Sequence, residues 1–178
     1  MKIVVIYRSK TGFTKMYAKW ISEELLCTAV PYEELKEVKI SEYDLIIFGS
    51  RIHAGKVDGF RKFKRQLEGN TTKLIVFATG ATPAKAKDVI DKIWKSSFSK
   101  EELSEIPHFY MQTGLNYERM RAGDRLIMKA LAKVLRNKKE KDSEEKGCEQ
   151  AIKNSYDISS REFITPLIDY IGNNKVCQ

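Results

Sequence analysis

The hydrophobic pattern along this chain alternates between short unbroken apolar runs and longer stretches with helical periodicity. The clear runs are residues 3–7, 44–50, 73–79 and 108–114. A weaker run, residues 27–32, contains Pro31, which would place it at a sheet edge or at the end of a strand. Because the runs are continuous rather than alternating, they predict strands buried on both faces, as in a parallel sheet.

Between these runs, apolar residues recur at helical spacing and form four stripes. The stripes are Tyr17, Ala18, Ile21 and Leu25; Phe60, Phe63 and Leu67; Ala86, Val89, Ile90, Ile93 and Trp94; and Ile164, Leu167, Ile168 and Ile171. In the last stripe, Pro166 predicts a kink, or a restart of the helix with Thr165 as its cap. Strands alternating with helices predict an α/β fold, an open five-stranded parallel sheet with helices on both faces. Ligands of such sheets bind beyond the carboxyl ends of the strands, so a site is expected in the loops there.

One segment, residues 115–160, is far longer than the usual connection between elements. Within it, residues 124–136 show a helical pattern with an apolar face opposite a basic face. The apolar face holds Ile127, Met128, Leu131, Val134 and Leu135, and the basic face holds Arg125, Lys129, Lys133 and Arg136. This pattern predicts contact of residues 119–139 with an anionic membrane surface. The alternative is that the apolar face packs on the sheet or on a second subunit, which would make a homodimer.

Length and composition indicate one domain, residues 1–178, with the long segment as an insertion within it. The chain has 32 basic and 24 acidic residues, a net charge of +8, which favours acidic partners. The cysteines, Cys27, Cys148 and Cys177, are far apart and form no C-x-x-C, so no metal site or redox dithiol is expected. With no signal peptide or membrane span in the pattern, we expect a cytoplasmic protein, either free or peripheral to the inner face of the cell membrane. No nucleic-acid motif is present, so no nucleic-acid partner is expected.

The loop after the first predicted strand is rich in hydroxyls. Ser9, Thr11 and Thr14 surround Gly12, and Lys10 adds a positive charge. A helix that begins here offers free N–H groups and a positive dipole end to an anion, and the hydroxyls can add donors. The alternative is simple N-capping by Ser or Thr. The P-loop and dinucleotide-binding patterns are absent, and a hydroxyl-rich loop without them suits a monophosphate such as that of FMN.

These motifs resemble those of the flavodoxins. "SKTGFT" (residues 9–14) resembles the flavodoxin FMN-phosphate loop, "GSRIHAG" (49–55) lies where the second flavin loop is expected, and "ATGATP" (78–83) follows the fourth strand. With "GLNYERMRAGDRLIMKALAK" (114–133), the chain is most similar to the branch of menaquinone-dependent protoporphyrinogen dehydrogenases and their flavodoxin-domain relatives. The resemblance covers nearly all of residues 1–172. It implies a flavodoxin-like fold with strand order 2-1-3-4-5 and FMN as the cofactor.

The resemblance also implies which residues contact FMN. They are Ser9, Lys10, Thr11, Gly12, Phe13 and Thr14; Gly49, Ser50, Arg51, Ile52 and His53; Ala78, Thr79, Gly80, Ala81 and Thr82; and Gly114, Leu115, Asn116 and Tyr117. No catalytic side chain is assigned, because the flavin carries the chemistry. Arg51 and His53 are the candidates for stabilising the anionic reduced flavin, which would ease two-electron reduction. The alternative is that Arg51 faces solvent and His53 caps or packs locally. Tyr117 is the candidate for covering the outer face of the flavin, or else an ordinary half-buried tyrosine.

Three functions are compatible with this pattern. The first is an FMN oxidoreductase that moves electrons between an organic donor, with protoporphyrinogen as a candidate, and a quinone-type acceptor. The second is a one-electron carrier that serves other redox proteins. The third is a non-catalytic module with a basic surface, and the hydroxyl-rich loop argues against it.

Overall fold

The computed structural model describes residues 1–69, 72–116, 118–120, 122, 123, 125, 126, 130 and 155–175. Its centre is a sheet of five parallel strands in the order β2-β1-β3-β5-β6. The strands are β1 (Ile3–Arg8), β2 (Thr28–Pro31), β3 (Leu45–His53), β5 (Lys73–Gly80) and β6 (His108–Gln112). This arrangement confirms the predicted α/β class and the predicted strand order.

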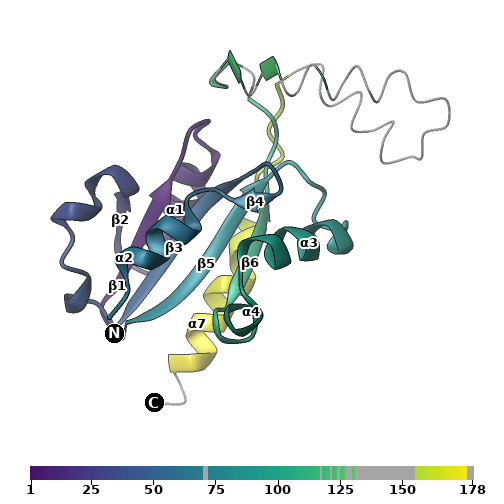
Figure 1. The fold of residues 1–178 in the computed structure, drawn as a ribbon. Helices are drawn as coiled ribbons and strands as arrows, with labels where there is room; N and C mark the ends of the chain where they lie inside the picture. Colours follow the sequence, from purple (N-terminus) through teal and green to yellow (C-terminus); the bar gives the residue numbers. More distant parts are fainter. Residues whose placement is uncertain are drawn as a thin grey trace.

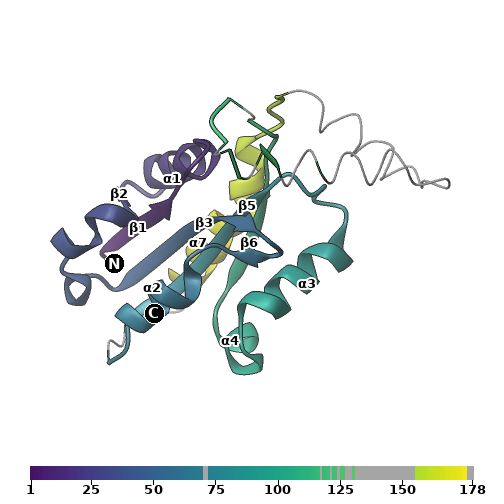
Figure 2. The same cartoon turned by 45° about the horizontal axis from the view of Figure 1, so that its top comes forward.

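Helices lie on both faces of the sheet, as Figures 1 and 2 show. The α-helices are α1 (Phe13–Glu24), α2 (Phe60–Gln66), α3 (Lys87–Ser97), α4 (Lys100–Glu105) and α7 (Thr165–Lys175). The described residues also form the 3-10 segments η1 (Tyr32–Glu37), η2 (Ile40–Glu42) and η3 (Arg161–Ile164). Among the helices of the described residues, none is long and apolar enough to cross a bilayer.

Alternate residues of the central strands enter two separate cores, which is why their sequences are continuously apolar. On β1, Val5 belongs to the core under α1 and α7, which includes Tyr17 and Leu167. Its neighbour Val4 belongs to the core under α2 and α3, which includes Phe60. A strand buried on both faces needs apolar side chains at every position. The prediction that the continuous apolar runs are strands buried on both faces is therefore confirmed for β1.

The end of β3 differs from the prediction. Residues 49–55 were expected as a loop, but β3 continues to His53 and forms a hairpin with the short strand β4 (Lys56–Val57). Ala54 and Gly55 make the turn with φ of 49° and 73°, the left-handed conformation that two-residue hairpin turns use. Ile52 pairs with Val57, and both pack in the core under α2 and α3, so this apolar pair extends the strand beyond the sheet edge.

Two shorter elements also depart from the expected pattern. The fifth strand was expected to run to residue 114, but β6 ends at Gln112. Helix α4 was not predicted, although its start carries a complete capping box between Ser99 and Glu102. The last helix restarts after η3 as predicted, but Thr165 is the first residue of α7 and not its cap, because its φ and ψ of −51° and −48° are helical.

The described residues show where the chain leaves the sheet after β6 and where it returns. Leu115 and Tyr156 form an antiparallel bridge, with both N···O distances at 2.9 Å. Gly114 permits this approach, because a Cβ at that position would overlap the backbone of Tyr156. Most of the predicted basic helix, residues 124–136, lies outside the described residues.

Candidate functional site

The β1–α1 loop presents an uncapped helix start. Gly12 is the N-cap residue of α1, with φ of 100°, and no side chain caps the helix. The alternative that Ser or Thr merely caps this helix is therefore not what the structure shows. The first turn also contains no acidic residue. A twelve-residue helix that begins in this way offers N–H donors and a positive dipole end to an anion.

Ser9 supplies the clearest sign that the loop is built for a ligand. Its Oγ is buried and has no hydrogen-bond partner among the residues that the structure describes. An unsatisfied buried hydroxyl is costly, on the order of 1–3 kcal/mol, and buried hydroxyls normally find partners. A phosphate oxygen would satisfy this hydroxyl, so the residues of the loop fit the phosphate of FMN.

A pocket of about 360 Å³ lies beside this loop. Its lining consists of Arg8, Ser9, Lys10, Glu33 and Arg119. Three cationic side chains face one carboxylate there, so the pocket favours an anion. Sequence reasoning assigned Ser9 and Lys10 to the cofactor but not Arg8, Glu33 or Arg119. The basic residue before a hydroxyl-rich loop was a usable signal for Arg8, whereas no local pattern brings Arg119 to this loop.

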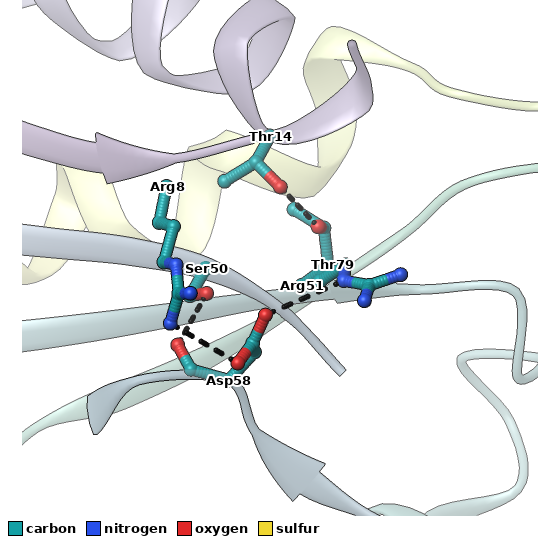
Figure 3. Close-up of polar contacts among 6 residues, drawn as sticks. All are labelled: Arg8, Thr14, Ser50, Arg51, Asp58 and Thr79. Carbon is teal, nitrogen blue, oxygen red and sulfur yellow. Dashed lines mark hydrogen bonds and ion pairs between the residues drawn. The ribbon is translucent and has the colours of Figure 1, made fainter. Parts of the chain in front are cut away.

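Thr14 does not point to this pocket. Its Oγ1 lies 2.8 Å from Oγ1 of Thr79 on β5, and both residues are only 2% exposed. Figure 3 shows the two hydroxyls facing each other between α1 and the sheet. The structure shows that the Thr14 hydroxyl ties the helix start to the sheet, and its donation to a phosphate stays a prediction. Thr79, also expected to contact the cofactor, is its partner.

Arg51 takes part in an ion-pair cluster at the carboxyl ends of β1 and β3. Asp58 lies between two arginines, with Oδ1 at 3.1 Å from an Nη of Arg8 and Oδ2 at 3.5 Å from Nε of Arg51 (Figure 3). Ser50 Oγ donates to the backbone oxygen of Asp58 at 2.6 Å. The side chain of Arg51 is 15% exposed, so the alternative of a solvent-facing arginine is wrong. Two arginines and one aspartate leave a net charge of about +1 in this cluster.

Asp58 was missed by sequence reasoning. The Asp58–Gly59 pair is a turn signal that follows the hairpin, and Gly59 has φ of 76°. Because Gly59 has no side chain, the guanidinium of Arg8 can occupy the place that a Cβ of residue 59 would take. His53 ends β3 and pairs with Lys56 across the hairpin, where it is partly buried.

The loop after β5 is fixed by side chains of the neighbouring strand β6. The hydroxyl of Tyr110 lies 2.7 Å from the backbone oxygens of Gly80 and Thr82. Burial raises the pKa of the Tyr110 phenol well above its usual range, so this group acts as a neutral donor. Gln112 Oε1 accepts from the backbone N–H of Ala84 at 2.8 Å. Sequence reasoning found this loop but not Tyr110 and Gln112, which hold it.

Several expected contact residues are buried in the structure, and their contact with the cofactor stays a prediction. Gly49 leaves space for the ring of Phe77, Ala78 is fully buried, and Gly114 faces the backbone of Tyr156. The expected contacts that remain partly exposed are Ser9, Lys10, Thr11, Gly12, Phe13, Arg51, Ile52, His53, Gly80, Ala81, Thr82, Leu115 and Asn116. Tyr117, expected over the flavin, lies outside the described residues.

Comparison with known proteins assigns the family. Residues 4–143 match the Flavodoxin domain family, so the chain belongs to that family. This membership supports FMN as the cofactor, which the anion site at the β1–α1 loop also fits. No curated protein matches the chain.

The chain is also similar to solved structures. A flavoprotein from Lactobacillus acidophilus NCFM, solved in complex with FMN, is 16% identical, with 62% of this chain and 91% of that chain covered and a TM-score of 0.43. A flavodoxin from the domain Archaea is 15% identical, with coverage of 85% and 94% and a TM-score of 0.43. The Trp repressor binding protein from Bacillus subtilis is 20% identical, with coverage of 80% and 100% and a TM-score of 0.42.

Proposed function

We propose that this protein is an FMN-dependent oxidoreductase that passes electrons between an organic donor and a quinone-type acceptor. The observation that carries the FMN assignment is the buried, unpartnered Oγ of Ser9 at an uncapped helix start, beside a cationic pocket. These three features meet at the carboxyl end of β1, where ligands of open α/β sheets bind.

Bound FMN would supply the redox chemistry, and the chain sets its position and its potential. Ser9, the start of α1 and the cationic side chains of the pocket would hold the phosphate. The cluster of Arg8, Asp58 and Arg51 keeps a net positive charge at the same edge of the sheet. Positive charge near a reduced, anionic flavin favours its formation, as Coulomb's law requires.

The donor and the acceptor are proposed from the resemblance to the menaquinone-dependent protoporphyrinogen dehydrogenases, with protoporphyrinogen as the first donor to test. The net charge of +8 is compatible with an acidic donor or with an anionic bilayer that contains quinone. A one-electron carrier is the second candidate. The pairing of Asp58 with Arg51 favours the carrier, because the Asp58 carboxylate offsets part of the positive charge that would stabilise the anionic, two-electron-reduced flavin.

Two measurements test these proposals in sequence. Fluorescence titration of the apoprotein with FMN, riboflavin, NAD and ATP should show FMN as the preferred ligand, and a preference for NAD or ATP would exclude the FMN assignment. Redox titration of the FMN-loaded protein then separates the two functions. A single two-electron wave, with turnover of protoporphyrinogen or a menaquinone analogue, supports the enzyme. Two well-separated one-electron potentials without turnover support the carrier.

A membrane contact through residues 119–139 is part of the proposal, and most of that stretch lies outside the described residues. Co-sedimentation with anionic vesicles tests it. Binding that is lost at high salt and on charge reversal at Lys129 and Lys133 supports the contact. A protein that ignores anionic vesicles at low salt would instead point to a soluble acceptor, and analytical ultracentrifugation would show whether the segment joins two subunits.

A further inference from the structure

Arg119 approaches the phosphate loop from a distant part of the sequence. One Nη of its guanidinium lies 3.1 Å from the position that a Cβ on Gly12 would occupy. Figure 2 shows the start of the insertion, in green, beside the N-terminal end of α1. Arg119 also lines the pocket that contains Ser9 and Lys10. A basic group from the insertion therefore lies beside Gly12, the N-cap residue of α1.

The backbone around Arg119 is held in place by a series of contacts. The bridge between Leu115 and Tyr156 fixes the point at which the insertion starts. The side-chain oxygen of Asn116 accepts from the backbone N–H of Arg119 at 3.1 Å. A guanidinium nitrogen of Arg125 donates to the backbone oxygen of Glu118 at 2.7 Å. These contacts direct residue 119 towards the loop without using its guanidinium.

The other cationic side chains of the pocket have interaction partners, whereas the guanidinium of Arg119 has no carboxylate partner among the described residues. Arg8 is paired with Asp58, and Lys10 also has a partner. Within the described part of the chain, no carboxylate forms an ion pair with Arg119, although Glu33 lines the same pocket. The pocket thus combines an unpaired guanidinium with the unpartnered hydroxyl of Ser9. Both groups are hydrogen-bond donors, and a phosphate dianion offers the acceptors that would satisfy them.

We propose that Arg119 binds the phosphate of the cofactor, so that the insertion, together with the β1–α1 loop, selects a phosphorylated flavin over riboflavin. This inference rests on the proposed FMN function. An arginine suits the role because its planar guanidinium can give two parallel hydrogen bonds to phosphate oxygens. It also adds a full charge to a site that otherwise uses N–H groups, a hydroxyl and cations that already have partners.

The test compares FMN and riboflavin, which differ only in the phosphate. Dissociation constants for both ligands would be measured by flavin fluorescence with the wild-type protein, Arg119→Ala, Arg119→Lys and Arg65→Ala. Arg119→Ala should weaken FMN binding by roughly 10- to 100-fold and leave riboflavin binding unchanged. Arg119→Lys should weaken FMN binding less than Arg119→Ala, because lysine keeps the positive charge but cannot give the two parallel hydrogen bonds of a guanidinium. Arg65→Ala is the control, an exposed arginine of α2 that does not line the pocket, and it should change neither constant.

The outcomes separate this inference from the function on which it rests. If the wild-type protein does not prefer FMN to riboflavin, the proposed FMN function fails. If it does prefer FMN and Arg119→Ala keeps the same preference, Arg119 is not a phosphate ligand and the function stands without it. Equal weakening by Arg119→Ala and Arg65→Ala would show an unspecific effect of lost positive charge, and a parallel loss of riboflavin affinity would show a structural role of Arg119. Either result would overturn the inference. Inorganic phosphate should also compete with FMN less effectively in Arg119→Ala than in the wild type.

Discussion

The side-chain hydroxyls of Thr14 and Thr79 are hydrogen-bonded to each other, 2.8 Å apart, in a position where neither residue is more than 2% exposed. The bond joins the first turn of α1 to the end of β5. It therefore fixes the helix start, and with it the loop that precedes the helix, against the sheet. A threonine that resembles a phosphate ligand in the sequence acts here as a structural tie.

This pairing predicts that Thr14 matters for stability and Thr11 for cofactor affinity. Thr14→Val should lower the free energy of unfolding by about 1–3 kcal/mol, because it leaves the hydroxyl of Thr79 buried without its partner. The double variant Thr14→Val/Thr79→Val should lose less unfolding free energy than the sum of the losses in the single variants Thr14→Val and Thr79→Val. Urea unfolding of the four proteins measures this. Additive losses would mean that the two hydroxyls do not interact.

A change at Thr11, which is partly exposed, tests whether this threonine contributes to FMN affinity. Thr11→Ala should weaken FMN binding by about tenfold, as expected for a lost hydrogen bond to a charged group. It should leave the urea midpoint of the apoprotein unchanged. If Thr11→Ala destabilises the apoprotein and leaves FMN affinity intact, the roles of the two threonines are the reverse of those proposed.

Ser9 should show opposite effects on stability and on binding. Because its Oγ is buried without a partner, Ser9→Ala should leave the unfolding free energy of the apoprotein unchanged or raise it by up to about 1 kcal/mol. The same change should weaken FMN binding by about tenfold. Thermal unfolding with and without FMN measures both effects, with Ser22→Ala on the exposed side of α1 as the control. A clear loss of apoprotein stability would show that Ser9 has a structural partner after all.

The fold was predictable from the sequence because its main signal is local. Each position of β1 from Ile3 to Tyr7 is apolar, and the structure buries alternate residues in two cores. The hairpin at the end of β3 was not predictable in the same way. Its turn residues, Ala54 and Gly55, are not one of the strong hairpin dipeptides, and the preceding arginine and histidine look like a polar loop. Helix α4 was within reach, since Ser99 and Glu102 have capping-box spacing.

The site was predictable only as far as it lies in one loop. Ser9 and Gly12 are adjacent in the sequence, so their pattern indicates an anion site directly. The contacts of Thr14 with Thr79, and of Arg119 with Gly12, join residues that are far apart in the chain. Such pairs depend on how strands and insertion are placed in space, and no spacing rule contains that information. Asp58 shows the same limit, because its role follows from the two arginines that converge on it.

The cluster around Asp58 should set part of the flavin potential. Asp58→Asn removes one negative charge and should raise the midpoint potential of bound FMN by tens of millivolts, whereas Arg51→Glu should lower it. Asparagine keeps the shape of the side chain, and its single amide oxygen can accept from one of the two arginines, whereas its NH2 group cannot accept from the other. Spectroelectrochemistry of the FMN-loaded variants measures both shifts. If neither potential moves beyond error, the cluster is structural and Arg51 has no part in tuning the cofactor.

Glu33 should oppose the binding of a phosphate, because it is the carboxylate among the described residues that line the pocket. Glu33→Gln should tighten FMN binding by about two- to fivefold at low salt, the size expected for an exposed charge. The gain should shrink as salt screens the pocket, and riboflavin binding should not change. Glu34→Gln is the matched control, since Glu34 is the next residue of η1 and does not line the pocket. A weaker affinity for FMN in Glu33→Gln would contradict this prediction. It would mean that the Glu33 carboxylate orients the cationic side chains of the pocket for phosphate binding.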